Sequence, residues 1–135
     1  MAPNPPRRKV LIIEDEPSIR NILYVLVAGL GYDGDAASDA HQALSMIRKD
    51  QFDAVLLDLR CSKLPPDQMV NAITELRPSL LGRVLVISGE VSAPSTLEML
   101  ERYAVPHVPR DRVTSDLSRS IAQMDGFTSF IFTPR

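Results

Sequence analysis

Short apolar runs alternate with amphipathic segments along most of this chain. The runs at 10–13, 54–57 and 84–87 are apolar throughout, and each ends abruptly at polar residues. Such runs are typical of strands that are buried on both faces of a parallel sheet. A weaker strand over about 33–37 contains Gly34 and Asp35, which indicates an edge position. A fifth, short strand is expected near 105–108.

Helical periodicity fills the intervals between these runs. Pro17 favours the start of a helix that Gly29 and Gly31 end. Ser38 is expected to cap the next helix, which carries apolar positions from 40 to 47. Further helices are predicted through 69–76, ending before Pro78, and over about 94–103 and 112–124.

This alternation occurs five times, with connections too long for hairpins. It predicts an α/β fold in which a five-stranded parallel sheet is doubly wound, in the flavodoxin-like manner, with helices on both faces. The expected domain covers 9–124. Residues 1–8 hold three prolines and are expected to form a disordered tail. Residues 125–135 form a phenylalanine-containing C-terminal tail outside the repeating pattern.

Composition restricts the classes of function. The chain of 135 residues fits one ordinary domain, and its formal net charge of -2 does not favour direct nucleic-acid binding. Its single cysteine, Cys61, cannot form an intrachain disulfide, which suits the cytoplasm. The longest uncharged apolar stretch, 21–32, is too short to span a membrane. We therefore expect a cytoplasmic protein with no membrane or direct nucleic-acid partner.

Polar residues follow the predicted strands at their carboxyl ends. Glu14 and Asp15 follow the first strand, Asp58 the third and Ser88 the fourth. Ligands of open parallel sheets bind outside these ends. Three carboxylates that converge there repel one another unless a cation lies among them, and hard oxygen ligands suit Mg²⁺. A carboxylate can also attack phosphorus, as in aspartyl-phosphate enzymes. Acidic residues at strand ends also serve as solvated loop residues or helix caps, but the order and spacing of the whole set favour a site.

These residues resemble the receiver domains of bacterial response regulators, across about 9–124. Glu14 and Asp15 are similar to the family's acidic pair and Asp58 to its phosphoacceptor, while Ser88 resembles its phosphoryl-binding hydroxyl residue. Arg110 stands where the family has a lysine. The separations along the chain match the family.

The resemblance implies a function in two-component signalling without an enzymatic activity of its own. Mg²⁺ would be held by Glu14, Asp15, Asp58 and the backbone carbonyl of Arg60. A histidine kinase or a phosphotransfer protein would donate the phosphoryl group to Asp58. Only about ten residues follow the last predicted helix, so output is expected through contacts with a downstream protein target. A homodimer is left open.

Several positions depart from the family's pattern. Arg110 keeps the positive charge of the lysine but replaces a compact ammonium with a planar fork. Asp111 stands where the family usually has proline, so the 110–111 peptide is expected to be trans. His107 takes the place of the usual aromatic switch residue. Arg60 and Glu90 would flank the phosphoryl site in this fold. A pair across the pocket would slow attack by water, but an exposed arginine–glutamate pair more often contributes little.

Two other classes of function compete with a phosphoryl-controlled switch. The first is a pseudo-receiver, an interaction module that no longer uses phosphorylation. Arg110 favours it, as does the loop after Asp58, which lacks the family's proline four residues on and its later Asp-Gly. The second is a phosphohydrolase that works through Asp58, but Arg60 stands where the common Asp-x-Asp arrangement has its second acid. A dinucleotide-binding role is excluded because no G-x-G-x-x-G follows a strand.

Overall fold

The computed structural model describes residues 7–61, 64–89, 98, 100–102 and 104–124. Its sheet has five parallel strands in the order β2-β1-β3-β4-β5. This arrangement confirms the predicted doubly wound α/β fold, and β2 lies at an edge as predicted. The strands are β1 (Lys9–Ile13), β2 (Asp33–Ala37), β3 (Ala54–Asp58), β4 (Val84–Ser88) and β5 (His107–Pro109).

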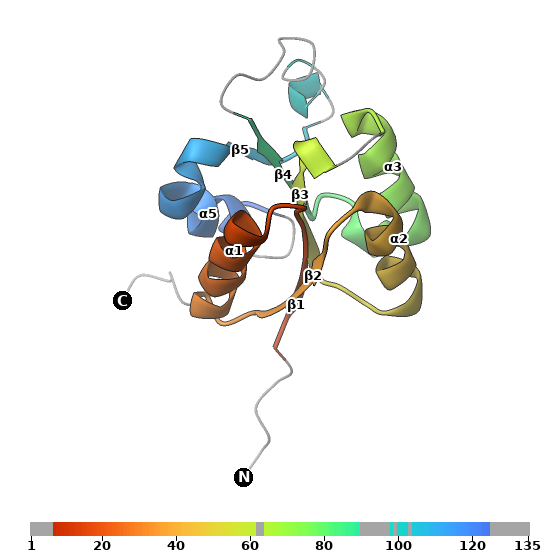
Figure 1. Ribbon diagram of the computed structural model, residues 1–135. Coiled ribbons are helices and arrows are strands. Elements are labelled where there is room, and N and C mark those ends of the chain that lie inside the picture. Colours follow the sequence, from red (N-terminus) through yellow and green to blue (C-terminus); the bar gives the residue numbers. More distant parts are fainter. Residues whose placement is uncertain (1–6, 62–63, 90–97, 99, 103, 125–135) are drawn as a thin grey trace, which may run out of the picture.

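Helices cover both faces of the sheet. Helices α1 (Pro17–Gly29) and α5 (Val113–Ala122) lie on one face, and α2 (Ala40–Lys49) and α3 (Pro66–Leu76) lie on the other (Figure 1). Short 3₁₀ turns span Leu59–Cys61, Pro78–Leu80 and Arg110–Arg112. Of the helix predicted over 94–103, residues 98 and 100–102 are helical, and the others lie outside the described residues together with 1–6 and 125–135. No helix in the described ranges is long and apolar enough to cross a membrane.

The core consists of two apolar clusters, one on each face of the sheet. In β1, Leu11 and Ile13 pack into the cluster under α2 and α3, while Val10 and Ile12 pack into the cluster under α1 and α5. Successive side chains of a strand point to opposite faces, so a strand between two helical layers must be apolar throughout. This is the physical reason for the uninterrupted apolar runs in the sequence.

Two local predictions were wrong. The cap of α2 is Asp39, whose side chain accepts a hydrogen bond from the backbone N–H of Gln42 at 2.7 Å. The Ser38 hydroxyl instead donates to the Gln42 side chain at 3.0 Å. The last strand covers His107–Pro109 rather than 105–108. Its first paired residue follows Pro106, which has no N–H to give to a sheet.

The register of the strands brings the polar residues to one end of the sheet. Ile13 of β1 pairs with Leu57 of β3, so the residues that follow them, Glu14 and Asp58, continue along neighbouring strands. Ser88, the last residue of β4, pairs with Pro109. Arg110 comes directly after that pair. The four positions therefore meet at the carboxyl edge.

Candidate functional site

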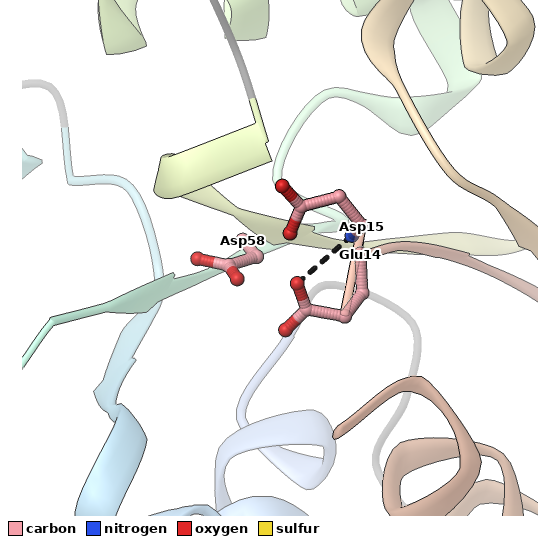
Figure 2. Close-up of side chains that lie close together, drawn as sticks. All are labelled: Glu14, Asp15 and Asp58. Carbon is pink, nitrogen blue, oxygen red and sulfur yellow. Dashed lines mark hydrogen bonds between the residues drawn. The ribbon is translucent and has the colours of Figure 1, made fainter. Parts of the chain in front are cut away.

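Three carboxyl groups meet where β1 and β3 end. Ligand oxygens of Glu14, Asp15 and Asp58 all lie within 4.8 Å of one another. Glu14 and Asp58 are fully buried, whereas Asp15 is exposed. Figure 2 shows the three side chains gathered at these strand ends. The structure thus brings together the three acids that the sequence predicts as a metal site.

Glu14 is held in place by the turn that leads from β1 into α1. One oxygen of its carboxylate accepts hydrogen bonds from the backbone N–H groups of Asp15, at 2.9 Å, and Glu16, at 3.4 Å. The guanidinium of Arg20 donates to the Glu14 carbonyl at 3.1 Å. These contacts tie the first acid of the cluster to the start of the helix.

The two oxygens of Asp58 differ in their surroundings. Oδ1 accepts hydrogen bonds from the backbone N–H of Arg60 at 3.0 Å and from Nη2 of Arg110 at 2.5 Å. Oδ2 is buried and accepts no hydrogen bond from the described residues, although the Arg60 Nε atom lies 3.8 Å away. A buried carboxylate oxygen without a donor is costly, so this oxygen is suited to a cation.

Arg110 contacts the predicted phosphoacceptor directly. Its side chain is only 15% exposed and pairs with the fully buried Asp58. The 3₁₀ turn Arg110–Arg112 after β5 places it there, and the Arg110–Asp111 peptide is trans, as predicted, like every other peptide bond of the described residues. The side chain of Arg110, at the sequence position where the receiver family has a lysine, therefore contacts Asp58.

Arg60 has a partner that the sequence analysis missed. Its Nη2 atom lies 3.4 Å from Oε2 of Glu16, which precedes Pro17 at the start of α1. The other oxygen of Glu16 accepts a hydrogen bond from the Ser18 hydroxyl at 3.0 Å. Glu90, which the sequence offered as one possible partner, lies outside the described residues. The continuous acidic run from 14 to 16 was a signal that a third acid would lie near the site.

Ser88 lies on β4, the strand next to that of Asp58, and His107 lies on β5, one strand further along the sheet. Ser88 is 2% exposed at the end of β4, one residue beyond Ile87, which pairs with Asp58. His107 opens β5, is partly buried, and its Nδ1 atom lies 3.1 Å from the Val105 carbonyl oxygen.

The donor set fits a divalent cation that prefers oxygen ligands. The cluster has three carboxylates, and two arginines, Arg60 and Arg110, approach Asp58. Hard carboxylate oxygens around a partly open position suit Mg²⁺, which keeps several of its waters. A cavity of about 320 Å³ lined by Asp15, Glu16 and Arg60 opens the cluster to solvent.

Comparison with known proteins identifies the family. The family described as "Response regulator receiver domain" matches residues 10–122. The chain belongs to this family, whose members are the receiver domains of two-component systems and bind Mg²⁺ in their active site.

Among curated proteins, the chain is similar to the transcriptional regulatory protein ZraR of Salmonella typhimurium, with 27% identity over 117 residues. That match covers 84% of this chain and 26% of ZraR. A match to the DNA-binding response regulator MtrA of Mycolicibacterium smegmatis has 38% identity over 53 residues and covers 39% of this chain and 23% of MtrA. The chain thus spans about a quarter of the length of the curated relatives that it matches.

Solved structures show the same fold. A response regulator receiver domain protein from Clostridium thermocellum aligns with a TM-score of 0.72 and 22% identity, covering 84% of this chain and 90% of that one. The receiver domain of the sensor histidine kinase PA1611 from Pseudomonas aeruginosa, which has a magnesium ion coordinated in its active site cleft, aligns with a TM-score of 0.75 and 17% identity. It covers 92% of this chain and 100% of that one.

Proposed function

We propose that this receiver domain accepts a phosphoryl group on Asp58 in a Mg²⁺-dependent reaction and passes the signal to a protein partner. One observation carries the proposal: the carboxylate of Asp58 is fully buried within the acidic cluster, yet one of its oxygens accepts no hydrogen bond within the described part of the chain. A purely structural aspartate in this position would satisfy both oxygens. An oxygen that is kept without a donor is available to a metal ion or to phosphorus.

The donor is a phosphohistidine of a histidine kinase or of a phosphotransfer protein. A carboxylate oxygen of Asp58 forms a bond to phosphorus as the phosphorus–nitrogen bond breaks, and the imidazole leaving group takes up a proton. The product is an acyl phosphate on Asp58. The protein's contribution is positioning and charge compensation, as in phosphoryl transfer generally.

Glu14, Asp15, Asp58 and the backbone carbonyl of Arg60 would hold the Mg²⁺. When bound, the ion offsets the charge that develops on the phosphoryl oxygens. Asp15 is exposed and Asp58 is buried, so the ligands of the cluster extend from the protein surface into its interior. Glu14, held by backbone N–H groups, fixes the position of its neighbour Asp15.

Arg110 and Ser88 would couple the phosphoryl group to the rest of the domain. Arg110 now donates to Asp58, and guanidinium binds phosphate oxygens well, so it can transfer to the phosphoryl group once that group is attached. Ser88 lies on the adjoining strand and can donate its hydroxyl to the same group. Movement of these residues would change the surroundings of His107 and thereby a partner surface.

The output would go to a downstream protein target in the cytoplasm, without an enzymatic activity of the domain itself. ZraR is named as a transcriptional regulatory protein and MtrA as a DNA-binding response regulator, and the chain matches about a quarter of the length of each. We assign residues 9–124 to the receiver domain. A pseudo-receiver that lacks phosphorylation is the competing function, and Arg110 in the lysine position is the observation that favours it.

Labelling with a small phosphodonor separates these two functions. Wild-type protein incubated with acetyl phosphate and Mg²⁺ should gain one phosphoryl group in intact-mass spectra, and chelation of the metal should abolish the gain. Asp15→Asn should be labelled far more slowly, whereas Asp33→Asn, an exposed acid at the far end of the sheet, should behave as wild type. A folded wild-type protein that stays unlabelled would favour the pseudo-receiver.

A further inference from the structure

The Arg60 side chain lies between two acids of different character. Its Nε atom is 3.8 Å from Oδ2 of Asp58, the buried oxygen to which no described residue donates a hydrogen bond. Its Nη2 atom is 3.4 Å from Oε2 of Glu16, which is 49% exposed. One guanidinium therefore bridges the interior of the acidic cluster and the rim of its opening.

Charge explains why the arginine is placed there. Three carboxylates within 4.8 Å of one another favour any cation that reaches them, and Arg60 is a cation on the same chain. The cavity at this opening is lined by Arg60, Glu16 and Asp15. A divalent ion that binds the cluster from this cavity therefore lies close to the guanidinium of Arg60.

We propose that the Arg60 side chain acts as a counter-cation that competes with divalent metal ions for the acidic cluster. When a metal binds, the guanidinium moves away from Asp58 and keeps its ion pair with Glu16, which we call its seat. The proposal rests on the metal site of the proposed function. It adds a residue whose side chain sets how tightly that site holds its ion. Ser18, which donates to the far oxygen of Glu16, keeps this seat in position.

The size of the competition follows from Coulomb's law. A single and a double positive charge roughly 5 Å apart in a water-like dielectric repel enough to change an equilibrium constant about tenfold. Arg60 is 53% exposed, so this solvent-screened value is the appropriate one. Replacing Arg60 with an uncharged residue of similar length should therefore tighten Mg²⁺ binding by about tenfold.

Isothermal titration of the full chain with MgCl₂ at constant ionic strength tests the competition. Arg60→Met removes the charge and keeps much of the length of the side chain, and Arg60→Lys keeps the charge and loses the planar fork. Arg112→Met is the matched control, because Arg112 is a 64% exposed arginine that pairs with Asp116 in α5. Urea unfolding of each variant verifies that it is folded.

The role of Glu16 is tested by combining two substitutions. Glu16→Gln removes one negative charge, which weakens Mg²⁺ binding whether or not Arg60 is present. In the presence of Arg60 it also removes the seat of the guanidinium, so the loss should be several-fold larger in the wild-type background than in the Arg60→Met background. Such a double-mutant cycle isolates the coupling between the two side chains.

The outcomes separate this inference from the proposed function. Tighter binding in Arg60→Met, unchanged binding in Arg112→Met and an unequal effect of Glu16→Gln support the inference. Equal or weaker binding in Arg60→Met overturns the competition, and equal effects of Glu16→Gln in the two backgrounds overturn the role of Glu16. If neither the wild type nor Arg60→Met binds Mg²⁺, the inference fails together with the metal site of the proposed function.

Discussion

Replacement of Arg110 by methionine should destabilise the domain, because it leaves the charge of Asp58 buried without its closest partner. The guanidinium lies 2.5 Å from Oδ1, and the two side chains are 15% and 0% exposed. Two unit charges about 4 Å apart attract by about 4 kcal/mol at an effective dielectric of about 20. Breaking a buried pair costs about 3–5 kcal/mol.

Two features reduce the expected loss. Arg110 keeps some contact with solvent, and the backbone N–H of Arg60 still donates to Oδ1 in the variant. We therefore expect Arg110→Met to lower the free energy of unfolding by about 2–3 kcal/mol. In urea this corresponds to a fall in the midpoint of about 1–2 M. Arg112 is exposed and its i,i+4 pair with Asp116 is worth about 0.5 kcal/mol, so Arg112→Met should move the midpoint little.

A second background identifies the origin of the loss. In Asp58→Asn the buried negative charge is absent, so a further Arg110→Met should cost less than about 1 kcal/mol, with a coupling energy of about 1–3 kcal/mol. Added Mg²⁺ should raise the midpoint of Arg110→Met more than that of the wild type, because a bound ion takes over part of the compensation. Equal losses in Arg110→Met and Arg112→Met, or equal losses from Arg110→Met in the two backgrounds, would refute the reasoning.

Two further predictions concern contacts away from the site. Lys9 bonds to Asp50 at 2.5 Å, and this hydrogen bond raises the pKa of Lys9 above its usual value and lowers the pKa of Asp50 below its own. The stabilisation by the pair should therefore be constant near neutrality. It should be lost as the pH falls through the lowered pKa of Asp50, and lost at alkaline pH as Lys9 deprotonates. The difference in urea midpoint between the wild type and Asp50→Asn should therefore disappear in acid, and a difference that persists there would contradict this. Asp39→Ala removes the cap that accepts from the Gln42 N–H and should cost about 1 kcal/mol in urea unfolding, and an unchanged midpoint would contradict that role.

The fold could be predicted from the sequence because the apolar pattern of each strand depends on how many helical layers cover it. A strand between two helical layers needs apolar residues on both of its faces, and the run 54–57 fulfils this need in full. The weak strand 33–37 was placed at an edge because Gly34 and Asp35 do not suit a buried position, and β2 lies there. Such rules act within a single strand or helix, so the sequence of that element predicts its position without knowledge of the elements that pack against it.

Contacts between loops could not be read in the same way. The sequence suggested Glu90 as one partner of Arg60, and in the described residues Arg60 pairs with Glu16, 44 positions earlier in the chain. The choice depends on how the 3₁₀ turn after β3 directs the side chain, which no periodicity encodes. The cap of α2 was missed for a similar reason: Ser38 and Asp39 are both good caps, and only the first turn of the helix decides between them.

Chemical mapping of the phosphoryl group tests the central claim most directly. After incubation with acetyl phosphate and Mg²⁺, borohydride reduces an aspartyl phosphate to homoserine, which peptide mass spectrometry locates in the chain. The account predicts homoserine at position 58 in the wild type, and none in a sample without Mg²⁺ or in Asp58→Asn. A folded protein that gives no homoserine, or gives it at a position other than 58, would contradict the assignment of Asp58 as the phosphoacceptor.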